Sequence, residues 1–159
     1  MKIRTDFVTN SSSSSFILAF TDENSILSEL VKTFDDNTMK YFNTVYQDIK
    51  NANPKTKEEI IEQIKEYYSW TIKYDLYINY VSAIKKHGMK PISRIEWAAL
   101  PTTQKLIEKR LNKIIKNIEE KIKDKTYLVE ISYSDHDNSE LEYHIMPHNT
   151  NCVMVFNNH

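Results

Sequence analysis

Cysteine and glycine each occur only once in this chain of 159 residues. The single cysteine, Cys152, excludes an internal disulfide framework and a zinc site built from four thiolates. No apolar run approaches the roughly 20 residues that a membrane-spanning helix needs, and the first residues lack the apolar segment of a secretory signal. We therefore expect a cytoplasmic protein of a reducing compartment that has no membrane partner.

Arginine is also scarce, since only Arg4, Arg94 and Arg110 stand among the 21 basic side chains. Arginine forms the bidentate hydrogen bonds by which proteins recognise bases and phosphates. Its scarcity therefore weakens the case for a nucleic-acid-binding role. The charge is unevenly distributed. Residues 83–125 have 12 basic and 5 acidic side chains, whereas residues 126–159 have 5 acidic side chains and no Lys or Arg. Such asymmetry indicates a binding face, or two segments that pair with each other in the fold.

Strand-like segments occupy both ends of the chain. Residues 2–8 alternate polar and apolar side chains, and residues 16–20 form a short apolar run of the kind found in buried strands. The strand pattern returns over residues 127–157, whereas residues 22–124 have the spacing of helices. We therefore predict one α+β domain over residues 1–159. Its terminal strands form a small antiparallel sheet, and about four to five helices form a long insertion.

The helical region contains distinct boundary signals. Thr56 and Glu59 have the spacing of a capping box at the start of a long helix, and Ser93 and Glu96 repeat this spacing at a shorter one. Gly88 follows the long helix, and we predict that it ends the helix in the left-handed backbone conformation.

Aromatic side chains are concentrated within the predicted long helix. They are Tyr67, Tyr68, Trp70, Tyr74, Tyr77 and Tyr80. Tyrosines at helical spacing usually bury their rings while their hydroxyl groups stay in contact with water. We therefore interpret this group as part of the core rather than as a ligand-binding box.

Two alternating segments near the C-terminus predict a hairpin. Apolar and polar side chains alternate over residues 127–133 and again over residues 141–146, and residues 135–139 form the turn between them. Antiparallel pairing through that turn would place Glu130 opposite His144. Such a pair suits half of a metal site, an acid–base pair or an ordinary cross-strand ion pair.

A run of five serines lies between the two N-terminal strand segments and forms the first candidate site. A loop of small residues can turn successive backbone N–H groups toward an anion, and hydroxyl groups add further donors. The glycines and the Gly-Lys-Ser/Thr ending of a nucleotide P-loop are missing. The alternatives are a solvated loop without a ligand and a phosphorylation site. The candidate residues for binding an anion or a partner are Lys2, Arg4, Asn10, Ser11, Ser12, Ser13, Ser14 and Ser15.

The opening sequence, MKIRTDFVTN followed by five serines and a phenylalanine, resembles the start of a group of proteins from low-GC bacteria and their phages. Members open with a basic strand, a Phe-Val-Ser/Thr-Asn step, a serine run and an aromatic residue. The residues Asp135, Glu142, His144 and His159 are similar to the acidic and histidine-containing end of some members. The resemblance implies a bacterial or phage-associated protein in which the serine run is a recurrent feature. It implies no particular reaction.

Four of the five histidines lie in the last 24 residues and form the second candidate site. Imidazole together with carboxylate suits zinc, iron, nickel or manganese, although no spacing here matches a known zinc signature. The alternative is a cluster of ordinary surface histidines. The candidate metal ligands are His136, His144, His159, Asp135 and Glu142.

Lysines recur along one face of the predicted last helix, at residues 105, 109, 113 and 116. They could contact phosphates or an acidic partner, or simply pair with the acidic tail. We favour a binding or interaction role through the serine run. The alternatives are a metal-dependent enzyme, such as a hydrolase, that uses the C-terminal His, Asp and Glu residues, and a binder of nucleic acid or an acidic partner through residues 103–124. The cofactor stays unassigned.

Overall fold

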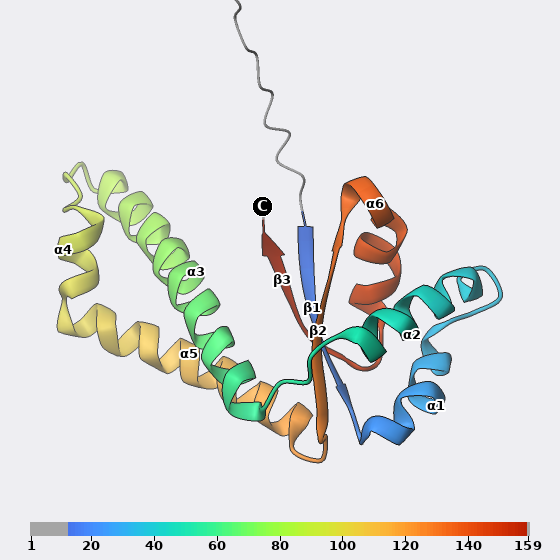
Figure 1. Ribbon diagram of the computed structural model, residues 1–159. Coiled ribbons are helices and arrows are strands. Elements are labelled where there is room, and N and C mark those ends of the chain that lie inside the picture. The colour runs from blue at the N-terminus through green and yellow to red at the C-terminus, as the bar shows by residue number, and fades with distance from the viewer. Residues whose placement is uncertain (1–12, 159) are drawn as a thin grey trace, which may run out of the picture. The chain divides into compact units, whose positions relative to one another are not determined.

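The computed structural model describes residues 13–158, apart from the side chains of residues 135–137, 157 and 158. The chain divides into two compact units (Figure 1). The sheet unit comprises Met1–Lys55 and Asp124–His159, and the helical unit comprises Thr56–Lys123. The predicted strand over residues 2–8 lies outside the described residues.

A three-stranded antiparallel sheet forms the centre of the sheet unit. The middle strand carries the predicted apolar run, and each residue from Phe16 to Phe20 is buried, as expected of a strand with a neighbour on either side. The α+β fold with a sheet built from both ends of the chain is thereby confirmed. In the order in which they lie in the sheet, the strands are β2 (Tyr127–Ser134), β1 (Ser13–Phe20) and β3 (Cys152–Asn158).

Helices cover one face of this sheet (Figure 1). Phe16, Leu18 and Phe20 belong to the same buried cluster as Ile26 and Leu30 of the first α-helix. Alternate side chains of a strand share one face, so this cluster lies between the sheet and the helices. The elements are η1 (Glu23–Ser25), α1 (Ile26–Leu30), η2 (Val31–Thr33), η3 (Met39–Tyr41), α2 (Phe42–Asn51), α6 (Asp135–Glu140), the π-helical turn η4 (Leu141–Ile145) and η5 (Met146–His148).

The prediction of a strand over residues 141–146 is wrong, because α6, η4 and η5 occupy this part of the chain. Leu141 and Ile145, four positions apart, are buried in the core together with Met146, whereas Tyr143 is exposed. A spacing of four is that of a helix face, and in so short an apolar run it can coincide with alternation. The predicted hairpin is therefore replaced by a helical connection between β2 and β3.

The helical unit contains three helices, which are α3 (Lys57–Lys86), α4 (Arg94–Ala99) and α5 (Pro101–Ile122). Both predicted capping boxes are present, at Thr56–Glu59 before α3 and at Ser93–Glu96 before α4. Gly88 has a φ of 71°, the left-handed conformation predicted for the end of the long helix. The described residues form six α-helices, α1 to α6, slightly more than the predicted four to five.

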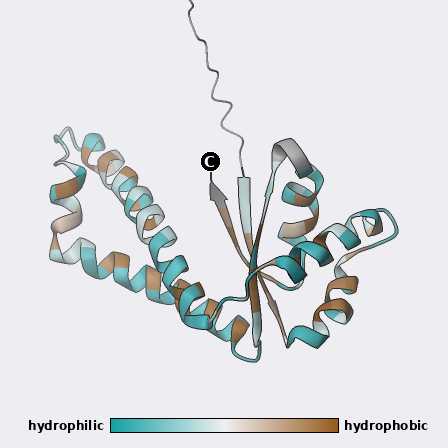
Figure 2. Ribbon diagram, viewed as in Figure 1, coloured by the Kyte–Doolittle hydropathy of each residue, from teal (hydrophilic) through white to brown (hydrophobic). Residues whose placement is uncertain are grey.

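The core of the helical unit is aromatic and aliphatic. Ile72 and Leu76 of α3 are buried together with Trp97 of α4 and Ile107 of α5. Along α5, apolar and polar segments alternate as in a helix with one buried face (Figure 2). Within the described residues, no helix combines the length and the hydropathy that crossing a membrane requires.

Candidate functional site

A groove of about 520 Å³ runs along β2 in the sheet unit, and we call it the edge groove. Residues of β2 line one side, and residues from the C-terminal part of α2 line the other. The start of β1 and a residue of α6 also contribute. The lining residues are Ser13, Asp48, Asn51, Ala52, Glu130, Ile131, Ser132, Tyr133, Ser134 and Asn138.

The backbone of β2 presents hydrogen-bonding groups to this groove. β2 is an edge strand, and on its outer side the carbonyl oxygen of Leu128 accepts a hydrogen bond of 2.8 Å from the N–H of Lys55. Backbone groups of an antiparallel strand point alternately to its two sides, and the register with β1 is regular from end to end. The N–H and C=O of Ser132 therefore point away from β1, on the same side as the carbonyl of Leu128.

Two serines of the run make their hydrogen bonds inside the sheet unit. The Ser15 and Ser132 hydroxyl oxygens are 2.7 Å apart, and the Ser14 hydroxyl donates to Glu142 Oε1 at 2.8 Å in a buried bond. The expectation of a loop through Ser13, Ser14 and Ser15 is wrong, because β1 already begins at Ser13. These residues pair with β2 and β3 on either side, and their hydroxyl groups find partners across the fold.

Acidic side chains stand at both walls of the edge groove. The Tyr133 hydroxyl donates to Asp48 Oδ2 at 2.8 Å. Burial raises the pKa of Tyr133, and the hydrogen bond to Asp48 and its negative charge raise it further, so the phenol stays protonated. Glu130 forms an ion pair with Lys55. The predicted pairing of Glu130 with His144 is therefore wrong, because Glu130 lies opposite Ile17 of β1 and meets Lys55.

The structure describes only part of the predicted anion or partner site. Ser13 lines the edge groove, whereas Ser14 and Ser15 are buried and bonded as described above. The other candidates lie outside the described residues, and these are Lys2, Arg4, Asn10, Ser11 and Ser12.

The C-terminal metal site stays a prediction. Glu142 of η4 is 1% exposed; its Oε1 accepts from Ser14, and its Oε2 is buried and meets no polar partner among the described residues. His144 is exposed. Among the residues that the structure describes, no three His, Cys, Asp or Glu side chains form a group that could hold a metal ion. The side chains of Asp135, His136 and His159 lie outside that part.

The lysine face stays a prediction as well. Lys105, Lys109, Lys113 and Lys116 lie on α5, and all four are exposed. Their placement is compatible with a long-range attraction to an acidic partner.

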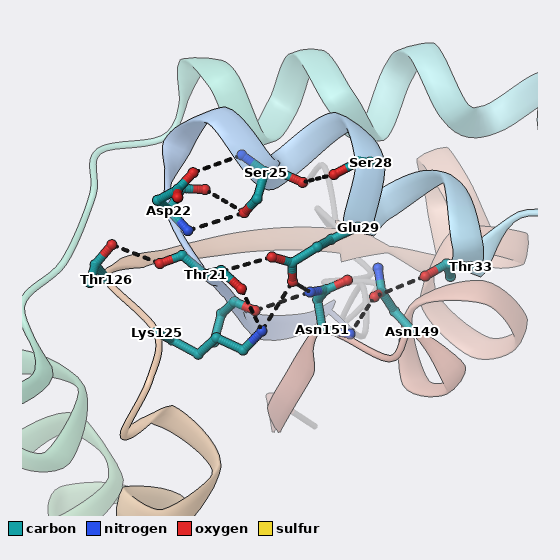
Figure 3. Close-up of polar contacts among 11 residues, drawn as sticks. Thr21, Asp22, Ser25, Ser28, Glu29, Thr33, Lys125, Thr126, Asn149 and Asn151 are labelled. Atoms are coloured by element: carbon teal, nitrogen blue, oxygen red, sulfur yellow. Dashed lines mark hydrogen bonds and ion pairs between the residues drawn. The ribbon is translucent and has the colours of Figure 1, made fainter.

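A polar network around Glu29 could not be predicted from the sequence (Figure 3). The Glu29 carboxylate accepts hydrogen bonds from the Thr21 N–H at 2.9 Å, from Lys125 Nζ at 3.0 Å and from Asn151 Nδ2 at 2.7 Å. Burial raises the pKa of Glu29, but the hydrogen bonds from Thr21, Ser25 and Lys125 outweigh burial and hold this pKa well below its ordinary value. The network therefore contains a stable carboxylate.

Asn149 extends this network to Thr33 of η2, the turn that follows α1 (Figure 3). Its Oδ1 accepts from the Thr33 hydroxyl at 3.1 Å and from the Asn151 N–H at 2.8 Å, and both asparagines are buried. Asn151 Nδ2 also donates to the carbonyl of Ala19 on β1 at 3.1 Å. Because these bonds join α1 to the strands, we assign the network a structural role. Its members are up to 130 positions apart, so no local pattern reveals it.

In comparisons with protein-family models, curated proteins and solved structures, nothing matches this chain.

Proposed function

We propose that the protein is a binding module that adds an extended, cationic segment of a protein partner to the outer edge of β2. The observation that supports this most strongly is the position of Ser132, whose outward-facing N–H and C=O lie in a groove along an edge strand. Partner segments commonly bind to sheet edges as an added strand, with main-chain hydrogen bonds providing affinity and neighbouring side chains providing specificity.

Charge favours a cationic segment. Asp48 and Glu130 line the edge groove, and residues 1–55 and 124–159 together have 13 acidic and 7 basic side chains. A surface with this excess of negative charge attracts cations over long distances and repels anions. Ser13, the described serine of the run that lines the groove, then acts in partner binding rather than in anion binding.

The resemblance of the opening sequence to bacterial and phage proteins supports the further proposal that the partner is met in the bacterial cytoplasm. An accessory protein with an adaptable edge strand can bind several partners that share only an extended conformation and positive charge, because main-chain bonds do not depend on side-chain identity.

Substitution at Ser132 tests the proposal. Proline removes the outward N–H but keeps every backbone bond to β1, and edge strands tolerate proline where the N–H faces outward. The control is Ser132→Ala, which loses the same bond to Ser15 but keeps the N–H. The probe is a short capped peptide in which lysine and valine alternate, titrated by calorimetry against the full chain. We expect Ser132→Pro to weaken binding about tenfold relative to Ser132→Ala.

Three results would contradict the proposal. One is equal affinity of the Pro and Ala variants for the lysine-valine peptide. Another is stronger binding of the matched peptide in which glutamate replaces lysine. The third is competition by inorganic phosphate at moderate concentration, which would indicate an anion site instead. Circular dichroism spectra of both variants establish that the sheet unit stays folded.

A further inference from the structure

Large apolar side chains of the helical unit face solvent where α3 lies beside α4. The exposed fractions are 62% for Trp70, 44% for Tyr74, 49% for Ile78 and 84% for Ile95. The rings of Trp70 and Tyr74 are stacked, with centroids 5.4 Å apart and planes within 8°. The interpretation of the aromatic group as core is therefore wrong for Trp70 and Tyr74. Contiguous exposed apolar surface usually indicates an interaction site.

Trp70, Tyr74 and Ile78 form a second apolar stripe of α3. Residues two positions apart in an α-helix point in nearly opposite directions, and residues four apart share a face. Ile72 and Leu76 point into the core of the helical unit, whereas Trp70, Tyr74 and Ile78 follow the opposite side. A helix with apolar side chains on opposite faces is usually covered on both. The inner face is covered by α4 and α5, whereas the second stripe is exposed and borders α4 along one side.

A hollow of about 160 Å³ lies between Trp70 and Tyr74 of α3 and Ile95 of α4. Two of the side chains around it are cationic, and among the described residues neither Lys73 nor Arg94 has an ion-pair partner. We call this surface the α3/α4 patch; the hollow is lined by Trp70, Lys73, Tyr74, Arg94, Ile95 and Ala98.

The charge of the helical unit selects the kind of partner. Residues 56–123 have 14 basic and 9 acidic side chains, so the unit attracts acidic molecules. A dimer that pairs the patch with the same patch of a second copy would bring Lys73 and Arg94 against like charges, which disfavours that mode of self-association. A lipid surface has no side chain of defined shape to fill the hollow.

We infer that the α3/α4 patch binds an acidic segment of a protein partner. An apolar side chain of that segment enters the hollow between Trp70 and Ile95, and neighbouring carboxylates face Lys73 and Arg94. Trp, Tyr and Arg are the residues most enriched where single side chains dominate binding free energy, and the patch contains all three. The patch and the edge groove lie in different units, so we expect variants of one to leave binding at the other unchanged.

Tryptophan emission provides the readout. Trp70 is exposed and Trp97 is buried, and these are the two tryptophans of the chain. The probe is a capped helical peptide with leucines along one face and glutamates elsewhere. Binding should shift the emission to shorter wavelength in the full chain, and Trp70→Phe should abolish the shift while retaining binding.

Arg94→Glu should weaken the binding of this peptide by about tenfold, because a cation facing a carboxylate becomes a like charge. Glutamate is favourable in the first turn of a helix, so α4 should remain folded. The matched control is Lys90→Glu, which makes the same change of net charge at an exposed position between α3 and α4, outside the hollow, and should change affinity less than about twofold.

Several results would overturn the inference. Equal effects of Arg94→Glu and Lys90→Glu would show that only long-range charge attracts the peptide. A dimer in sedimentation velocity that Trp70→Ala dissociates would assign the patch to a second copy. Binding to phosphatidylserine vesicles that the peptide does not displace would assign it to a membrane surface.

Discussion

Replacement of Glu29 by glutamine removes the charge from the network that joins α1 to the strands, while the size of the side chain stays the same. The amide can still accept from the Thr21 N–H, but its nitrogen faces two donors, Lys125 Nζ and Asn151 Nδ2. Two hydrogen bonds to a charged group are lost, and each contributes about 1.5–3 kcal/mol, not additively. We expect the free energy of unfolding of the sheet unit to fall by about 3 kcal/mol.

The assay must report on the sheet unit. Both tryptophans, Trp70 and Trp97, lie in the helical unit, so their fluorescence follows that unit alone. Hydrogen exchange of the β1 amides in increasing urea follows the sheet directly. The matched control is Glu23→Gln, which makes the same chemical change in an exposed ion pair with Lys50 at 2.6 Å. Exposed pairs contribute at most about 1 kcal/mol, so the control should lose little.

The contribution of the Glu29 carboxylate to stability should depend on pH in a known direction. The pKa of Glu29 is lowered in the folded protein, so the unfolded state binds more protons as the pH falls. The stability contributed by Glu29 is therefore fully present above the ordinary carboxyl pKa of about 4.3, and it declines as the pH falls below that value. The difference between the parent and Glu29→Gln should be constant near neutral pH and narrow in acid. The reasoning would be refuted if Glu29→Gln and Glu23→Gln lowered the free energy of unfolding equally. It would also be refuted if the stability difference between the parent and Glu29→Gln did not change with pH.

Further substitutions test other parts of the account. Gly88→Ala should cost about 1 kcal/mol through its positive φ alone, since no atom lies within 4 Å of an added Cβ; an unchanged melting temperature would contradict this. Ser14→Ala should cost about 1–3 kcal/mol in a urea titration, because it leaves the buried Glu142 carboxyl without its donor, and a neutral result would show that the carboxyl finds another. Trp97→Ala should destabilise the helical unit by about 3–5 kcal/mol in thermal melts, whereas Trp70→Ala should leave it within about 0.5 kcal/mol; equal losses would contradict the two environments.

Local signals in the sequence were sufficient to predict both ends of α3 and the start of α4. The two capping boxes each need only a hydroxyl and a carboxylate three positions apart, and both form as predicted. The conformation of Gly88 follows from one residue type at the end of a helix. The central strand was also predictable, because five successive apolar residues bounded by polar ones suit a strand that is buried on both faces.

Features that depend on distant residues were not predictable. Leu141 and Ile145 suit a strand and a helix equally well, and the packing of residues 141–146 against the core decides in favour of the helix. The polarity of Ser14 and Ser15 indicated a loop, but Glu142 and Ser132 satisfy their hydroxyl groups more than 100 positions away, so strand structure is stable there.

The edge groove depends partly on a local pattern in β2 and partly on contacts between distant residues. Its walls come from α2 and β2, whose residues are about 80 positions apart, so the groove has no sequence signature. Alternation along β2 does predict that the backbone N–H and C=O groups of Ser132 and Glu130 point to the same side of the strand. It does not predict whether another strand or solvent lies on that side. That information comes only from the order of the strands.

The amide hydrogen of Ser132 provides the most direct measurement of whether a partner strand adds to β2. Hydrogen exchange at this amide, followed by NMR with and without the lysine-valine peptide, reports whether the outward N–H gains an acceptor. We predict that saturating peptide slows exchange at Ser132 by about tenfold or more, while exchange at Ile131, whose N–H points to β1, changes little. Peptide binding with unchanged exchange at Ser132 would contradict strand addition at this edge.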